Sequence, residues 1–267
     1  HGLRDNSPRA LAPTVPVVTE AFRDRGYRTA AFVSAEPVAG KWGLGRGFET
    51  YNDAVTAAPS RLTPAERRGG ETVDVAVKWI KAVSRFDRPF FCWVPLFDPH
   101  LPYRAPAEFA DRFEHPYTAE VAYADACVGR LLEALARADR EKNTVVVVVG
   151  DHGESLGEHG EASHAHLVHG STIRVPLLIA GVDGTTAGRV VREPVSLVDL
   201  APTLYHLLGA RPPRVSGTSL LDVVRHPDAE PPRRPLYVES LYDFLHFGWA
   251  PLYADRLGPH YLIQADE

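Results

Sequence analysis

The sequence predicts an α/β fold in which a mostly parallel sheet is sandwiched by helices, and three observations predict it. Short apolar stretches of strand length alternate with amphipathic stretches of helical length along most of the 267 residues. The stretch 144–149 is rich in β-branched residues with no polar alternation, which is typical of a central parallel strand covered on both faces. Helical stretches of about a dozen residues separate the strands, as right-handed crossovers between parallel strands require.

Each element in the first half of the chain is predicted from its own periodicity. Apolar residues repeat at helical spacing in three stretches, and Val121, Ala124, Val128, Leu131 and Leu135 form the clearest stripe. Continuous apolar runs mark the strands between them. In order, we expect a helix at 14–25, a strand at 29–33, a Gly-rich loop at 40–53, a helix at 71–83, a strand at 89–97 and a helix at 118–137.

The second half contains fewer regular elements. A polar loop rich in histidine follows the strand at 144–149, and a strand is expected at 175–179. Asp199 is placed to cap a helix within 195–208 that carries Pro202 in its first turn. Residues 226–235 form a Pro-rich linker, and the short strands expected at 236–239 and 260–264 are too few to bury a core of their own.

Composition excludes several classes of protein. The net charge is −5 and no block of Lys or Arg marks a face that binds polyanions, which argues against a nucleic-acid partner. No stretch reaches the roughly 20 apolar residues of a membrane-spanning helix. Cys92 and Cys127 lie in apolar segments, so no disulfide framework or cysteine-based zinc site is expected. The chain contains no Met and begins at His1, which predicts a piece of a longer protein and leaves the cellular compartment open.

The chemistry is expected where the strands end. Ligands bind at the carboxyl ends of strands in open α/β sheets. Asp151 and His152 follow one strand between Gly150 and Gly153, which are expected to turn the backbone sharply, and His100 follows another. A carboxylate beside an imidazole suits a divalent cation, with oxygen favouring Ca²⁺ or Mg²⁺ and nitrogen allowing Mn²⁺ or Zn²⁺. The alternative is that Asp151 caps a turn and His152 is an exposed loop residue.

Five of the 12 histidines fall within eighteen residues of this loop, namely His152, His159, His164, His166 and His169. A self-contained zinc site is one interpretation, but the spacing matches neither a helical HExxH motif nor a Cys/His finger. A distributed site to which some of these histidines contribute ranks above it.

Several segments together resemble the sulfatases of the alkaline phosphatase superfamily. The segments 150–160, 171–179 and 195–203 are similar to the C-terminal half of such an enzyme, and 1–6, 26–34, 43–48 and 97–103 follow the family's order. The resemblance implies the alkaline phosphatase-like fold, truncated here, with a sulfatase-like domain at 1–225, the linker at 226–235 and the start of a small antiparallel subdomain at 236–267.

The resemblance also implies site residues. Asp151 and His152 match the second pair of metal ligands, and His100 matches a residue that contacts the sulfate or the leaving-group oxygen. His164 matches the Lys or His that binds the ester and assists the leaving group, as a His can near neutral pH. Lys41 matches a Lys that contacts the sulfate, with a surface Lys beside Trp42 as the alternative. The implied cation is Ca²⁺ first, or Mn²⁺ or Zn²⁺ for a phosphate or phosphonate esterase.

Two family features have no match within this sequence. The family's formylglycine nucleophile arises from a C/S-x-P-S/A-R motif, and neither cysteine lies in one. No Asp-Asp pair follows a first apolar strand. Both features precede the HGxRDN segment in the family, so we expect them upstream of His1. The chain 1–267 alone is therefore expected to show negligible sulfatase activity and weak affinity for metal.

The expected function is hydrolysis of a small-molecule or glycan sulfate ester. One alternative is a phosphodiesterase, phosphonate monoester hydrolase or phosphatase of the same superfamily, because fold alone does not decide the ester. A second alternative is a non-catalytic protein or a stand-alone zinc-binding protein. The leaving group and the oligomeric state do not follow from the sequence, and the aromatic residues of 244–249 are expected to pack in the C-terminal part rather than to line a rim of the site.

Overall fold

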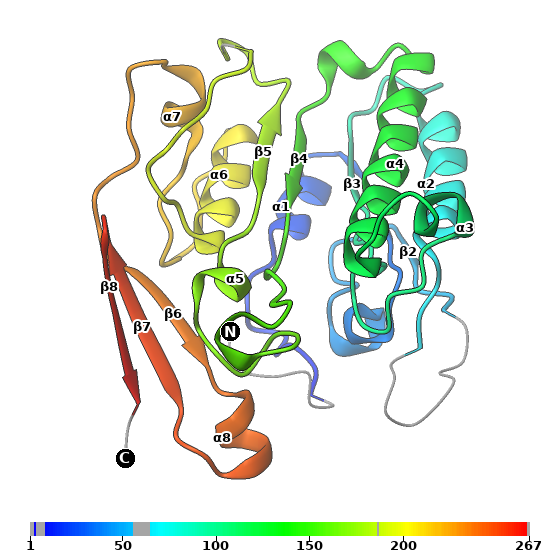
Figure 1. The fold of residues 1–267 in the computed structure, drawn as a ribbon. Helices are drawn as coiled ribbons and strands as arrows, with labels where there is room; N and C mark the ends of the chain where they lie inside the picture. The colour runs from blue at the N-terminus through cyan, green and yellow to red at the C-terminus, as the bar shows by residue number, and fades with distance from the viewer. Residues whose placement is uncertain (1–2, 4–8, 56–64, 186, 266–267) are drawn as a thin grey trace. The chain divides into compact units, whose positions relative to one another are not determined.

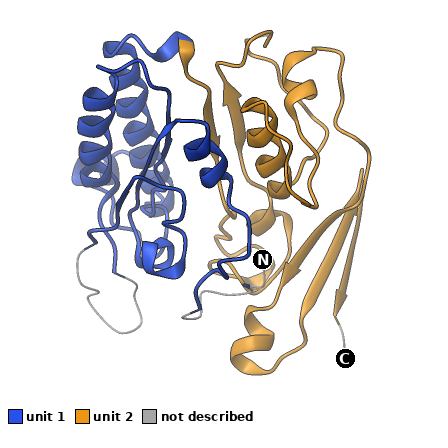
Figure 2. Cartoon of the chain, turned by 180° about the vertical axis from the view of Figure 1, so that it is seen from behind, with its two compact units in different colours: residues 1–142 blue, residues 143–267 orange. Residues whose placement is uncertain are grey.

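The computed structural model describes residue 3 and residues 9–55, 65–185 and 187–265. The chain divides into two compact units, residues 1–142 and residues 143–267, which are coloured separately in Figure 2. Each unit contains its own β-structure and is described by itself. The domain boundaries expected at 226–235 stay a prediction.

The first unit is built on a parallel sheet of three strands. Strands β1 (Arg28–Phe32), β2 (Thr50–Asn52) and β3 (Phe90–Trp93) lie in the order β2-β1-β3, with Ala30 opposite both Thr50 and Cys92. The parallel direction predicted for this part of the chain is confirmed. The helical elements are α1 (Val18–Asp24), η1 (Glu36–Val38), η2 (Gly40–Trp42), α2 (Gly69–Val83), α3 (Ala107–Ala110), α4 (Pro116–Arg137) and η3 (Glu141–Asn143).

The core of this unit forms where α2 covers β1. Ala30, Phe32 and Ala76 are buried together, and the small side chains of Ala30 and Ala76 let the helix approach the strand closely. Trp79 and Leu131 pack against this cluster from α2 and α4, which lie side by side in Figure 1. The apolar stripe predicted for α2 is buried at Val73, Ala76 and Ile80. Of the stripe predicted for α4, only Leu135 is buried and Val121 is exposed.

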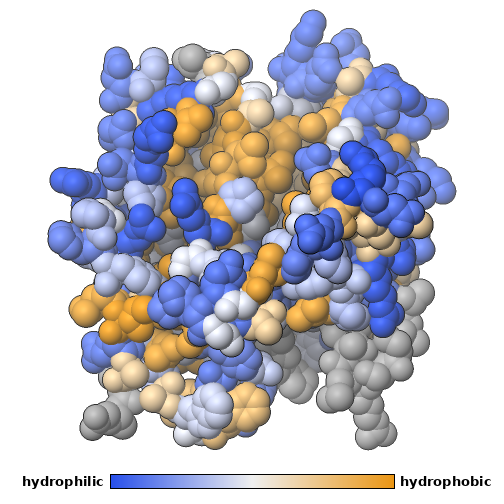
Figure 3. Space-filling view, viewed as in Figure 1, coloured by the Kyte–Doolittle hydropathy of each residue, from blue (hydrophilic) through white to orange (hydrophobic). Residues whose placement is uncertain are grey.

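The second unit begins with a strand pair whose direction differs from the prediction. Strands β4 (Val146–Val149) and β5 (Leu177–Ala180) are antiparallel, with Val147 opposite Ile179. The prediction of a parallel strand covered on both faces is wrong for β4, because β5 runs antiparallel to it and its last residue, Val149, is exposed. Figure 3 shows hydrophobic side chains gathered over this pair. An apolar run indicates that a strand can be buried, but it does not determine the direction of the neighbouring strand. A parallel neighbour needs a long crossover connection, usually a helix, and the connection after Val149 contains no long helix.

The helices of the second unit are short, and a buried acid fixes the longest of them. Before the C-terminal sheet they are η4 (Glu158–Gly160), α5 (Gly170–Ile173), η5 (Leu197–Asp199), α6 (Leu200–Leu207) and α7 (Leu221–Arg225). Asp199 is 1% exposed and stands at the N-cap of α6, but its side chain forms the capping box of η5 with Ser196. The same carboxylate accepts hydrogen bonds from Thr218 N at 2.8 Å and from Arg234.

A small antiparallel sheet closes the chain, as the resemblance implies. Strands β6 (Leu236–Ser240), β7 (Leu252–Leu257) and β8 (His260–Ala265) lie in that order, with the short helix α8 (Tyr242–Phe247) between β6 and β7. The Pro-rich segment before β6 is fastened by Arg189, which donates to the carbonyl oxygens of His226 and Ala229. Among the described helices, none is both long enough and apolar enough to span a membrane.

Candidate functional site

Asp151 and His152 lie directly after the carboxyl end of β4, where the sequence places them. Asp151 Oδ1 accepts a hydrogen bond from His152 N at 3.0 Å, and its side chain is 91% exposed. His152 Nδ1 lies 2.8 Å from Gly153 O. Because a carbonyl oxygen only accepts, Nδ1 carries a proton, and the neutral ring presents the lone pair of Nε2. This Nε2 lies 3.9 Å from Asp151 Oδ2.

These two groups fit a shared divalent cation. Two donors bonded to one ion at about 2.0–2.4 Å lie about 3–4 Å apart. The 3.9 Å between Asp151 Oδ2 and His152 Nε2 falls within that span. A His whose Nδ1–H is held by a backbone carbonyl is also the usual form of a metal-binding imidazole. Within the described ranges no group of three His, Cys, Asp or Glu side chains converges, so no complete ligand set forms around this pair there.

His164 adjoins this pair and is held by a buried acid. Its ring stacks on that of His152 with 4.0 Å between centroids, and its Nδ1 lies 3.2 Å from both carboxylate oxygens of Glu154. The Glu154 side chain is only 3% exposed. A carboxylate accepts, so Nδ1 of His164 is a donor and the ring orientation is fixed. The structure thus brings Asp151, His152 and His164 together.

Gly153 has a packing role rather than the turning role that the sequence suggests. Neither Gly150 nor Gly153 has a backbone conformation in the left-handed region. A Cβ atom on Gly153 would instead overlap the carbonyl oxygen of Ser171, and Gly153 N donates to Thr172 O at 2.6 Å. The glycine therefore lets the Asp151–His152 turn lie against the backbone that begins α5.

His166 forms a second acid-supported imidazole in the same loop. Its Nδ1 lies 2.7 Å from Oδ1 of Asp243, which lies in α8, 77 positions later in the chain. Glu161, also buried, accepts from the backbone nitrogens of His166 and Leu167. Ring stacking at 3.8 Å pairs the remaining histidines, His159 and His169. The described loop contains no convergent histidine set of the kind a stand-alone zinc site requires.

His100 lies in the first unit, in the turn after β3. Its ring stacks on Phe97 with 4.3 Å between centroids, and its Nδ1 lies 2.6 Å from Leu101 O. Asp98 anchors the same turn to the start of α2, because its Oδ1 accepts from Gly69 N at 2.9 Å. A Cβ on Gly69 would collide with this carboxylate, so the glycine permits the contact.

Two buried carboxyl groups lie beside this turn. Burial raises the pKa of Asp98, and the Gly69 N–H opposes part of the effect. Burial likewise raises the pKa of Glu120, whose carboxylate accepts from Arg104 N and feels the charge of Asp98. Both groups favour the protonated form more than an exposed carboxyl group does.

Lys41 is engaged by its neighbours. Its Nζ lies 2.5 Å from Glu36 Oε1 and 4.6 Å from the centre of the Trp42 ring, while the Lys41 side chain is largely exposed. The contact of Lys41 with a sulfate group stays a prediction. The segment 1–6 that resembles the family's HGxRDN motif lies, apart from Leu3, outside the described residues.

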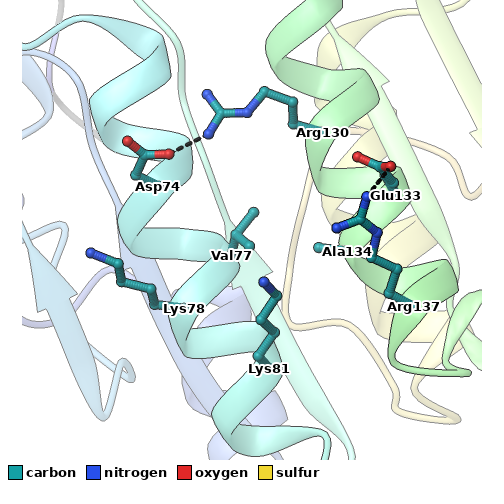
Figure 4. Close-up of a pocket in the computed structure, with 8 residues that line it drawn as sticks. All are labelled: Asp74, Val77, Lys78, Lys81, Arg130, Glu133, Ala134 and Arg137. Carbon is teal, nitrogen blue, oxygen red and sulfur yellow. Dashed lines mark hydrogen bonds and ion pairs between the residues drawn. The ribbon is translucent and has the colours of Figure 1, made fainter.

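A concave surface lies between α2 and α4, and its charged side chains pair with one another at the surface rather than forming a reaction site. The cavity of about 280 Å³ is lined by charged residues of both helices. Asp74 bonds to Arg130 across the groove, and Glu133 bonds to Arg137, as the dashed lines in Figure 4 show. Its carboxylates are thus neutralised by arginines within the described unit.

Sequence reasoning missed two residues that hold the site histidines. Glu154 is visible in the segment that follows β4, but its burial and its contact with His164 are not. Asp243 gives no signal, because its contact with His166 spans 77 positions and depends on the C-terminal sheet. The one weak signal in the sequence is that Asp243 is an acidic residue with aromatic residues close by in the chain.

Comparison with known proteins adds a family match. The family model described as "Sulfatase" matches residues 2–210. Arylsulfatase K of Canis lupus familiaris is 31% identical over 173 residues, which cover 58% of this chain and 31% of that protein. The chain therefore spans about a third of this curated relative.

Solved structures share the fold at low sequence identity. The candidate sulfatase yidJ of Bacteroides fragilis matches with a TM-score of 0.81 and 16% identity, over 97% of this chain and 69% of that chain. The phosphonate monoester hydrolase of Silicibacter pomeroyi matches with a TM-score of 0.75 and 18% identity, over 96% of this chain and 72% of that chain. The shared architecture is an α/β fold with a small C-terminal antiparallel sheet.

Proposed function

This chain belongs to the sulfatase family, and on that premise we propose that it supplies the cation-binding and leaving-group side of a sulfate ester hydrolase. The observation that carries the proposal is the Asp151–His152 pair, whose carboxylate oxygen and Nε2 are spaced to share one cation. A divalent ion held there would neutralise charge on the ester oxygens as the S–O bond breaks.

The protein's own groups take the remaining roles in this proposal. His164, oriented by Glu154, stands beside His152 and donates a proton to the leaving-group oxygen. The family resemblance supports His100 and Lys41 as residues that contact a sulfate group. Because neither cysteine lies in the nucleophile motif, residues 1–267 on their own turn over 4-nitrophenyl sulfate negligibly.

The cation in this proposal is Ca²⁺, with Mn²⁺ or Zn²⁺ for a phosphorus ester. The nitrogen ligand of His152 keeps the second choice open, because imidazole suits softer ions than Ca²⁺. The nitrogen ligand is the feature that favours the alternative function, which is a phosphodiesterase, phosphatase or phosphonate monoester hydrolase with the same fold.

A binding experiment tests the proposal without requiring turnover. Binding of 4-nitrophenyl sulfate and 4-nitrophenyl phosphate to residues 1–267 is measured by NMR titration with Ca²⁺, with Mn²⁺ and without a cation. We expect Ca²⁺-dependent binding of the sulfate ester that Asp151→Ala removes and that the exposed control Asp183→Ala retains. Binding that needs no cation, or that survives Asp151→Ala, contradicts the proposal. A Mn²⁺-dependent preference for the phosphate ester supports the alternative.

A further inference from the structure

The turn after β3 is fastened at both of its ends by a carboxyl group. We call residues 97–104 the His100 turn. Near its start, Asp98 Oδ1 accepts a hydrogen bond at 2.9 Å from Gly69 N, which begins α2. At its end, Arg104 N donates to Oε1 of Glu120 in α4. The turn is therefore held between α2 and α4, the two helices that lie side by side in Figure 1.

Both carboxyl groups are withdrawn from solvent. Glu120 is 4% exposed, and Asp98 Oδ2 is buried with no hydrogen-bond donor among the described residues. A carboxylate loses more free energy on burial than a protonated carboxyl group does, and burial raises the pKa of both residues. A protonated carboxyl group retains a carbonyl oxygen that accepts from a backbone N–H. Protonation therefore keeps both fastenings.

The His100 ring is joined to its own turn. It stacks on Phe97 with 4.3 Å between centroids and 18° between the ring planes, and its Nδ1 lies 2.6 Å from Leu101 O. The backbone nitrogen of His100 donates to Phe97 O at 3.0 Å. Because these contacts lie within the turn, a movement of the turn against α2 or α4 carries the imidazole with it.

The charges around the two carboxyl groups make the fastenings interdependent. Besides burial, the charge of Asp98 raises the pKa of Glu120. Glu66 repels both carboxylates and Arg68 attracts them. Asp98 also faces two groups of α4 whose pKa values are raised, mainly by burial, so that they stay neutral, namely Tyr123 and Cys127. When Asp98 and Glu120 are both ionised, three carboxylates therefore stand against one guanidinium group, and their repulsion weakens the hold on the turn.

We propose that Asp98 and Glu120 are positioning residues that set where the His100 imidazole lies. While the pair holds at least one proton, both backbone contacts form without strong repulsion and the ring stays in place. Because both pKa values are raised in the folded protein, this hold is complete below the ordinary carboxyl pKa of about 4 and weakens as the pH rises through the folded values. Contact of the ring with sulfate rests on the proposed function, whereas the placement of the ring does not.

Hydrogen exchange at the opposite end of the turn tests this role. Protection of Arg104 N–H is measured by NMR at mildly acidic pH in Asp98→Ala and in Asp98→Asn, the conservative variant that still accepts from Gly69 N. In Asp98→Ala we expect protection to fall roughly tenfold, as the loss of one hydrogen bond implies, and the His100 ring signal to shift. Asp98→Asn should leave both unchanged at this pH. The exposed Asp111→Ala is the matched control.

The reciprocal experiment follows Gly69 N–H in Glu120→Ala and Glu120→Gln, with the exposed Glu114→Ala as control. A pH series adds a readout that a merely structural contact would not move. In the unsubstituted chain, protection of Arg104 N–H should fall by up to about tenfold per pH unit between the ordinary and the folded pKa values. Asp98→Asn, which removes one carboxylate, should show a smaller fall. This comparison needs no Ala variant, so it decides the outcome even if an Ala variant fails to fold.

The positioning role is overturned if each Ala variant affects only its own backbone partner, if the Ala and conservative variants behave alike, or if the pH series is the same with and without Asp98→Asn. Inorganic sulfate separates this role from the proposed function. If the His100 signal follows the variants as expected but does not respond to added sulfate, the proposed contact with the ester fails and the positioning role stands. An equal response to sulfate in Asp98→Ala and in the unsubstituted chain overturns the positioning role.

Discussion

At the scale of single residues, three loop histidines share one feature, an oxygen acceptor that faces Nδ1 of the ring. Nδ1 of His152 faces Gly153 O, that of His164 faces Glu154, and that of His166 faces Asp243. Each acceptor fixes the ring orientation and makes Nδ1 the donor. Two of the three acceptors are carboxylates with little exposure, 3% for the Glu154 side chain and 13% for that of Asp243, and these acids hold the histidine rings in place.

Replacing Glu154 should therefore cost stability. Glu154→Ala removes the charged acceptor of Nδ1–H of the half-buried His164, while Ser163 Oγ stays 3.2 Å from Nδ1. We expect the free energy of unfolding to fall by about 1.5–3 kcal/mol, the range for a hydrogen bond to a charged group. Glu154→Gln keeps an acceptor oxygen and should lose less. Urea denaturation checks this against Glu193→Ala, an exposed acid in the same unit. Equal stability of the Ala variant and this control would contradict the role assigned to Glu154.

The raised pKa of Asp98 makes the free energy of unfolding depend on pH. Its pKa in the folded protein is raised by burial, so the folded state binds its proton more tightly than the unfolded state does. The stabilisation from this proton is complete below the ordinary pKa of Asp, about 4, and is lost as the pH rises through the folded pKa. Asp98→Asn, which still accepts from Gly69 N, should remove that loss.

Denaturation of this variant between acid and neutral pH, with the exposed Asp111→Asn as control, measures the effect. We expect the stability of Asp98→Asn relative to the unsubstituted chain to increase with pH. A constant difference across the range would show that the two states bind the proton of Asp98 equally.

At the scale of elements, the periodicity of apolar residues predicts most of the helices and strands, but it predicts little of how the strands pair. The stripe at 118–137 becomes α4, and the apolar run before Asp151 becomes β4. The antiparallel direction of β5 and the exposure of β4 depend on the connection between them and on neighbours, which a run of valines does not encode. The strands β2 and β7 were not predicted, because β2 is three residues long and β7 carries Asp255 and Arg256.

The placement of the candidate site residues was predictable to the same extent. Residues that follow a strand directly, such as Asp151 and His152, are found from the sequence because the end of a strand fixes their place. Glu154 and Asp243 are not, because their roles arise from burial and from a contact across 77 positions.

Gly153 allows a direct test of the loop against α5. A Cβ on Gly153 would overlap Ser171 O, whereas a Cβ on Gly170 meets no atom within 4 Å. We expect Gly153→Ala to lower stability by about 1–3 kcal/mol, the usual cost of overpacking, and to weaken Mn²⁺ binding by displacing Asp151. Gly170→Ala, the control, should leave both unchanged or raise stability slightly. Thermal unfolding and Mn²⁺ titration of both variants would refute the packing role if Gly153→Ala behaved like the control.

Asp199 should be the most sensitive acid of the second unit. It is 1% exposed, bonds to Arg234 and caps η5, so it fastens the Pro-rich segment before β6 to the start of α6. Asp199→Ala leaves Arg234 without its partner, and we expect a loss of about 3–5 kcal/mol, as when one partner of a buried ion pair is removed. Denaturation beside the exposed control Asp228→Ala checks this. A loss no greater than that of the control would mean that the ion pair is dispensable.

At the scale of the whole molecule, the predicted site residues are divided between two compact units. Lys41 and His100 belong to residues 1–142, and Asp151, His152 and His164 belong to residues 143–267. The family match at 2–210 runs across both units, which makes the sulfatase assignment a property of the chain rather than of one loop. The C-terminal sheet and α8 lie beyond that match, and α8 supplies Asp243, the acid that orients His166.

The central claim is that Asp151 and His152 hold a divalent cation, and locating that cation tests it most directly. Crystals of residues 1–267 grown with excess Mn²⁺ are measured at a wavelength where manganese scatters anomalously. The predicted result is a peak bonded to both Asp151 Oδ2 and His152 Nε2, which disappears in Asp151→Ala and persists in Asp183→Ala. A peak at other residues only, or no peak at this pair in well-ordered crystals, would contradict the account.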